Sequence, residues 1–106
     1  QRPSNQKVIS TLERRINFPP LRVYISDVLK TMPEEFDSHQ FIDAFVYQNQ
    51  WEYVYALWNG RAEFQTINDA IIHWLRESGL VRQVGTRNSE NMFKRVRPAA
   101  VWRKVA

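Results

Sequence analysis

The chain has 106 residues, no cysteine and a formal net charge of +4. A chain of this length forms one domain with a core of its own. Without cysteine it forms no disulfide, thiolate zinc site or iron–sulfur cluster. No apolar run approaches the ~20 residues that a membrane-spanning helix needs. The sequence therefore predicts a protein without a membrane partner, located in the cytoplasm or, in a eukaryote, in the nucleus.

Charge is divided unevenly along the chain. Residues 1–22 hold five basic residues against one acidic residue, residues 23–79 hold three against nine, and residues 80–106 hold seven against one. Basic clusters favour polyanionic partners, and an ordinary solvated surface is the alternative explanation. The last block thus becomes the first place to look for a nucleic-acid contact.

Apolar side chains at helical spacing predict five helices. They span about 4–16, 20–32, 38–49, 51–58 and 65–78. Asp37 or Ser38 is suited to cap the third helix, because both side chains accept hydrogen bonds from free backbone amides. The boundary between the third and fourth helices is soft, and the alternative is one merged helix.

The fourth predicted helix is rich in aromatic residues. Its apolar residues recur at i, i+3, i+4 and i+7, which predicts a stripe that faces the core. The members of this stripe are Trp51, Val54, Tyr55 and Trp58. Tyr47 and Tyr53 fall off the apolar stripes, and we expect both to be exposed. Exposed tyrosines often anchor protein interfaces, whereas base stacking calls for interleaved basic residues that this acidic stretch lacks.

The fifth predicted helix has the most regular pattern. A continuous apolar stripe predicts that one face packs on the core, and its members are Ile67, Ala70, Ile71, Trp74 and Leu75. Gly79 follows the helix and suits the left-handed conformation of a C-terminal cap.

The C-terminal region predicts β-structure. Two β-prone runs, 80–87 and 92–97, surround the polar turn residues 88–91, a pattern typical of a hairpin. Pro98 favours an edge position or the end of the second strand, because proline donates no ladder hydrogen bond. The tail, 99–106, fits either a short helix or a third strand.

The order of these elements resembles that of a winged helix-turn-helix domain, in which a two-stranded wing follows three helices. The resemblance is clearest at Leu75-x-x-x-Gly79-Leu80-Val81, which looks like the exit of a recognition helix into the wing. It covers about residues 37–98 and names a superfamily only.

The resemblance implies a fold that is mainly α with a small β-hairpin. Residues 1–36 are then an N-terminal helical extension, and residues 37–106 are the winged-helix part of the same packed domain. It also implies double-stranded DNA as the partner and a regulatory role, for example in transcription.

In helix-turn-helix proteins the N-terminal part of the recognition helix meets base edges. The resemblance assigns this role to the polar face of 65–78, with candidate contacts at Thr66, Asn68, His73 and Arg76. Asparagine can bond bidentately to adenine, and Arg76 is better placed for a phosphate. Asp69 and Glu77 on the same helix oppose a polyanion.

The predicted hairpin supplies the candidate phosphate contacts, which are Arg82, Arg87, Lys94, Arg95 and Arg97. Side chains alternate across a strand, so Arg95 and Arg97 share one face and Lys94 lies on the other. The alternative function of these cations is to keep an exposed edge strand from pairing with other chains.

Signals of catalysis are poor. The three glycines form no phosphate-binding loop, and His39 and His73 lie on different predicted helices without metal-ligand spacing. The sequence predicts no enzyme activity, no metal and no cofactor. Two hypotheses from different classes remain: DNA binding, and a protein–protein interaction module, in one version a homodimer, that uses the acidic aromatic helices within 34–64.

Overall fold

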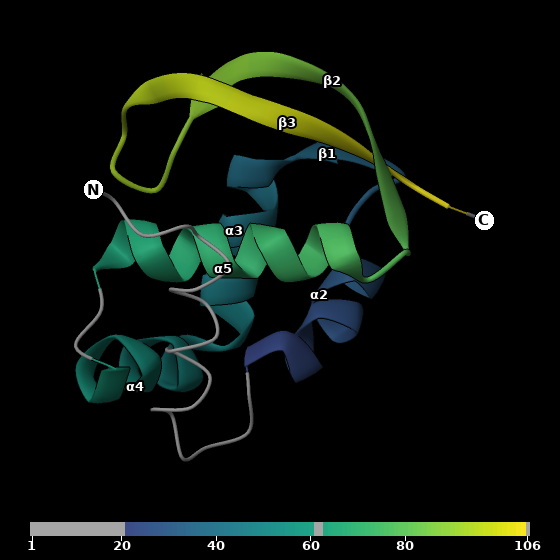
Figure 1. Ribbon diagram of the computed structural model, residues 1–106. Helices are drawn as coiled ribbons and strands as arrows, with labels where there is room; N and C mark the ends of the chain where they lie inside the picture. The colour runs from purple at the N-terminus through teal and green to yellow at the C-terminus, as the bar shows by residue number, and fades with distance from the viewer. Residues whose placement is uncertain (1–20, 61–62, 106) are drawn as a thin grey trace, which may run out of the picture.

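The computed structural model describes residues 21–60 and 63–105. The helix predicted at about 4–16 lies outside these residues. Within them the fold is mixed α/β, with four α-helices, one 3-10 helix and a three-stranded antiparallel sheet (Figure 1). The elements in chain order are η1 (Leu21–Tyr24), α2 (Ile25–Thr31), β1 (Glu35–Asp37), α3 (Ser38–Gln48), α4 (Gln50–Gly60), α5 (Phe64–Glu77), β2 (Val81–Glu90) and β3 (Val96–Lys104).

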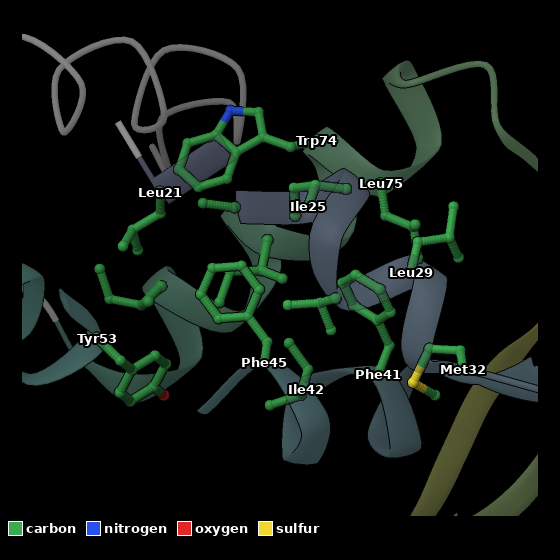
Figure 2. Packing of buried hydrophobic residues seen from close by; sticks show 14 of the residues in the cluster. Leu21, Ile25, Leu29, Met32, Phe41, Ile42, Phe45, Tyr53, Trp74 and Leu75 are labelled. Carbon is green, nitrogen blue, oxygen red and sulfur yellow. The ribbon is translucent and has the colours of Figure 1, made fainter. Parts of the chain in front are cut away.

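The hydrophobic core is built from η1, the four α-helices and residues of all three strands. Figure 2 shows Phe41 and Phe45 of α3 beside Ile25 of α2, with Leu75 of α5 close by. The described part of the predicted N-terminal extension therefore packs into the same core as the rest of the chain. This packing follows from sequence patterns, because each helix presents an apolar stripe that gains free energy on leaving water.

Helix α5 forms as its pattern predicts. All five residues of the predicted stripe are buried, and the helix ends one residue before the predicted end. Gly79 adopts a φ of +74°, the left-handed conformation that glycine reaches without steric cost. The chain then turns directly into β2.

Helix α4 buries a different face from the one predicted. The core-facing residues are Tyr53, Ala56 and Gly60, while Trp51 and Trp58 are 72% and 80% exposed. The expectation of a core-facing tryptophan stripe was wrong. The small residues at 56 and 60 suit a close approach of the α4 backbone to its neighbours, which a face of bulky indoles does not offer.

The hairpin has longer strands and a later turn than predicted. Residues 88–90 belong to β2, and the turn occupies residues 91–95. Asn91 organises this turn: its Oδ1 accepts hydrogen bonds from the amides of Phe93 (2.9 Å) and Arg95 (3.2 Å), and its own amide donates to the Arg95 carbonyl (2.9 Å). Such side-chain turns are a strong local preference of asparagine.

Residues 99–104 of the C-terminal tail form neither a short helix nor a separate third strand: they continue the second strand of the hairpin, as part of β3. Strand β3 is central in the order β1-β3-β2, and β1, which the sequence did not predict, pairs with it at Arg103, Trp102 and Val101. Pro98 lies inside β3, opposite Asn88 of β2 and outside the stretch paired with β1. No strand of the described chain lies beside residue 98 on the β1 side of β3, so no ladder hydrogen bond on that side requires a backbone amide from this proline.

One buried carboxylate joins the sheet to the helices. Asp37, 1% exposed, ends β1 and caps α3, where its Oδ1 accepts a hydrogen bond from the Gln40 amide (2.9 Å). Its Oδ2 accepts from Nε of Arg87 in β2 (2.9 Å). Arg87 Nη2 also donates to Gln40 Oε1 (2.8 Å), and the same oxygen accepts from the Asp37 amide (2.9 Å). The hairpin is thus tied to the N-terminus of α3.

The titration of Asp37 follows from these contacts. Burial raises the pKa of its carboxyl, but hydrogen bonds from the Gln40 amide, Arg87 and Ser89, with the charge of Arg87, outweigh burial and leave the pKa below 3.8. The ionised form is therefore favoured in the folded chain.

Trp102 of β3 closes the core beneath this junction. It is buried, and its Nε1 donates to Ser38 Oγ at the start of α3 (2.9 Å). None of the helices formed by the described residues has the length and apolar character to cross a membrane.

We predict that Asp37→Asn lowers the free energy of unfolding at pH 7 by about 1.5–3 kcal/mol, the range for hydrogen bonds to charged groups. Because the pKa of Asp37 is lowered on folding, its stabilisation is complete above 3.8 and is lost as the pH falls through the folded pKa. The difference between wild type and variant, measured by urea unfolding, should shrink towards pH 3.

Asp27→Asn is the matched control, because Asp27 forms an exposed pair with Lys30 on α2. Exposed pairs contribute little, so this variant should differ from wild type by less than about 1 kcal/mol at every pH. If Asp37→Asn lowers the free energy of unfolding by the same amount at pH 3 as at pH 7, the stabilisation does not depend on ionised Asp37 and the prediction is wrong.

Candidate nucleic-acid interface

The β2–β3 hairpin is the most exposed basic element. Every residue of β2 from Arg82 to Asn88 is exposed, and Figure 1 shows the hairpin running back along α5 with its turn near the start of that helix. The described residues 80–105 carry seven basic residues and one acidic residue. This ribbon therefore presents positive charge to solvent over most of its length.

The five predicted phosphate contacts differ in whether their side chains already bind another group of the protein. Arg87 is held by Asp37 and Gln40, and Lys94 lies 3.7 Å from Glu90 in an exposed pair. Arg82, Arg95 and Arg97 are exposed and form no ion pair with any acidic residue that the structure describes. Among the five predicted contacts, these three are the ones without an acidic partner in the described chain.

Two further cations at the base of the hairpin were not among the predicted contacts. Arg103 lies opposite Arg82 in the ladder and donates to Glu35 Oε1 (2.8 Å). Lys104 follows it and is half-buried. Both residues belong to the basic block 80–106, so the sequence indicated their charge. Only the pairing of the tail with β2 shows that they lie at the base of the hairpin.

A groove of about 510 Å³ separates α5 from the hairpin. One wall is the polar face of α5, and the other is formed by the turn and by the stretch 98–100 of β3. Three of the four predicted α5 contacts, Asn68, His73 and Arg76, line this groove, and Thr66 does not. His39 at the start of α3 also lines it, so the fold brings together two histidines that the sequence separates.

Asn68 is engaged inside the protein. Its Oδ1 accepts a hydrogen bond from the hydroxyl of Tyr53 (2.6 Å), and its Nδ2 lies 3.4 Å from the sulfur of Met92 in the turn. The ring of Phe93 meets Phe64 edge-on, with centroids 5.5 Å apart. The turn is therefore packed against the N-terminal half of α5.

Tyr53 is buried, contrary to prediction, and is not available as an interface residue. It is 1% exposed, because Asn68 supplies the acceptor that lets a phenol enter the core. Burial raises the pKa of Tyr53 to about 12, although the hydrogen bond with Asn68 lowers it. The hydroxyl therefore remains a donor at neutral pH. Tyr47, in contrast, is 78% exposed, as predicted.

Several other polar groups of the groove have partners within the protein. The guanidinium of Arg76 lies over the Trp102 ring, 5.4 Å from its centroid. His39 Nδ1 lies 2.7 Å from Ser89 Oγ in β2, and Gln65 donates to Asp69 (2.7 Å). No group of three or more histidine, aspartate or glutamate side chains within the described chain is arranged to hold a metal ion. The groove is polar, and its positive charge comes from Arg76.

Comparisons with known proteins found no matching family model, no matching curated protein and no matching solved structure.

We predict that Tyr53→Phe destabilises the fold by about 1–2 kcal/mol, because it leaves the Asn68 carbonyl without its donor in a partly buried place. Tyr47→Phe removes the same hydroxyl from an exposed ring and should stay within about 0.5 kcal/mol of wild type. Urea unfolding of both variants measures the difference. Equal stabilities would show that the Tyr53–Asn68 hydrogen bond contributes nothing.

Proposed function

We propose that this chain is a winged helix-turn-helix domain that binds double-stranded DNA through the β2–β3 hairpin. The observation that carries the proposal is the hairpin itself, a two-stranded ribbon whose β2 strand is exposed from Arg82 to Asn88 and whose open cations are Arg82, Arg95 and Arg97. Phosphate contacts by such residues supply most of the affinity of non-specific DNA binding.

The arrangement of elements supports the winged-helix assignment. Helices α3, α4 and α5 precede an antiparallel hairpin, and the α5 exit passes through Gly79 in the left-handed conformation before Val81 enters the core. These are the features at Leu75–Val81 on which the resemblance rests. The ion pair of Arg87 with Asp37 holds the hairpin in place, so its cations are presented on a positioned element.

The distribution of acidic residues supports the same choice of surface. Helices α3 and α4 contain no lysine or arginine and two carboxylates, Asp43 and Glu52. These two helices therefore attract a polyanion less than the basic hairpin does. This polarity orients the molecule on approach, because long-range fields steer charged partners.

We expect the chain to bind a random-sequence duplex at about 50 mM salt, with affinity falling steeply by about 200 mM. Arg95→Gln/Arg97→Gln should reduce the slope of log K against log salt by about 1.8, at roughly 0.9 for each lost phosphate contact. Fluorescence anisotropy across the salt series measures both quantities.

The matched control is Arg22→Gln/Lys30→Gln, which removes two exposed cations from η1 and α2. It makes the same change in net charge and should leave the slope unchanged. Equal losses in the two double variants would mean that net charge alone drives binding. Undetectable binding of the wild type at low salt would exclude the proposed function.

A second candidate function is protein–protein contact through α4. Trp51, Val54 and Trp58 are exposed at i, i+3 and i+7, so they form one outer face of the helix. Large exposed aromatic residues are enriched at interfaces. The simplest partner to test is a second copy of the chain.

For this second function we predict concentration-dependent self-association of the wild type in sedimentation equilibrium, lost in Trp51→Ser/Trp58→Ser. Because both indoles are exposed, the variant should keep its urea midpoint. Phe36 and Phe41 belong to the same acidic aromatic segment, 34–64, but are buried in the core. Replacing them would therefore test the stability of the fold and not self-association. A wild type that remains monomeric at all concentrations would exclude the homodimer.

A further inference from the structure

We propose that the hairpin binds the sugar-phosphate backbone without reading base sequence, because helix α5 is not available to enter a major groove. This inference rests on the nucleic-acid binding proposed above. It concerns the kind of DNA site recognised, and it departs from what the winged-helix resemblance implies, base contacts by Thr66 and Asn68.

The first step is steric. The N-terminal part of a recognition helix has to approach base edges closely, and here the hairpin turn packs against that part of α5 at Phe64 and Asn68. Phe93 contacts Phe64 at 5.5 Å between centroids, and Met92 packs against the hydrophobic core and lies within 3.4 Å of Asn68. A duplex reaches the Asn68 side of α5 only if the turn moves away.

The second step concerns hydrogen bonding. Bidentate recognition of adenine uses both the carbonyl and the amino group of an asparagine. The Asn68 carbonyl oxygen already accepts from Tyr53, and its amino group faces the Met92 sulfur. Turning the amide to a base would leave the buried Tyr53 hydroxyl without its acceptor, an unfavourable exchange.

The third step is electrostatic. The exposed charges of α5 include two carboxylates, Asp69 and Glu77. These carboxylates repel the DNA phosphates that line both sides of a major groove. The basic residue of the helix, Arg76, lies over the Trp102 ring. The hairpin, in contrast, carries three exposed cations without an ion pair to any described residue, Arg82, Arg95 and Arg97.

These three observations lead to one expectation about specificity. Phosphate contacts position a protein on DNA but carry no direct sequence information. A domain that binds by the hairpin alone therefore binds duplexes of different sequence with similar affinity. In contrast, each wrong base pair in a specific site lowers affinity by about 5- to 150-fold.

The first experiment is selection from a randomised duplex library at about 50 mM salt, followed by anisotropy titration of the selected and starting pools. We expect no enriched motif and affinities within about threefold of each other. A motif in which single base-pair changes reduce affinity tenfold or more would overturn this inference while leaving DNA binding intact. Absence of binding to every duplex would overturn the proposed function, and this inference with it.

The second experiment fixes the turn on α5. The chain has no cysteine, so Phe64→Cys/Phe93→Cys creates one pair of thiols at two half-exposed positions, which a short bismaleimide can join. We expect the crosslinked chain to bind duplex DNA within about threefold of the same variant with its thiols capped separately. A tenfold or greater loss on crosslinking, with urea unfolding showing that the chain remains folded, would show that the turn has to open and would overturn the inference.

Discussion

The buried carboxylate of Asp37 is the constraint on which the arrangement of this domain depends. A carboxylate that is 1% exposed is stable only when its oxygens accept hydrogen bonds and an opposite charge lies near. Here the Gln40 amide at the start of α3 and the Arg87 guanidinium of β2 meet these needs. The end of β1, the first turn of α3 and the middle of the hairpin are therefore fixed relative to one another.

This constraint explains why the hairpin lies along α5. Arg87 is at the seventh position of β2, well along the strand from the α5 exit, and its attachment to Asp37 draws the ribbon back over the helices. The turn then packs on the beginning of α5, where Met92 and Phe93 meet Asn68 and Phe64. Residues whose chemistry suits DNA contact, Arg87 and Asn68, are used here to hold the protein together. The surface that we propose for DNA is the outer part of the hairpin, where Arg82, Arg95 and Arg97 are exposed.

The chemistry of a side chain does not reveal whether its partner lies inside or outside the protein. Arg87 and Arg95 are both arginines on one predicted hairpin, yet Arg87 faces a buried aspartate from fifty residues away and Arg95 lies in the exposed turn. Tyr53 and Tyr47 differ in the same way. The phenol of Tyr53 enters the core because Asn68 accepts its proton, whereas Tyr47 is exposed to solvent.

The sequence by itself determined the features that depend on neighbours along the chain. These are the buried stripe of α5, the cap at Asp37, the left-handed Gly79 and the existence of a basic C-terminal hairpin, because helical spacing, capping and turn preferences act over a few residues. Only the tertiary structure decided the exposed face of α4, the strand β1, the central place of β3 and the engagement of Arg87 and Asn68. Those features depend on contacts between residues 15 to 68 positions apart, and local pattern carries no information about such distant partners.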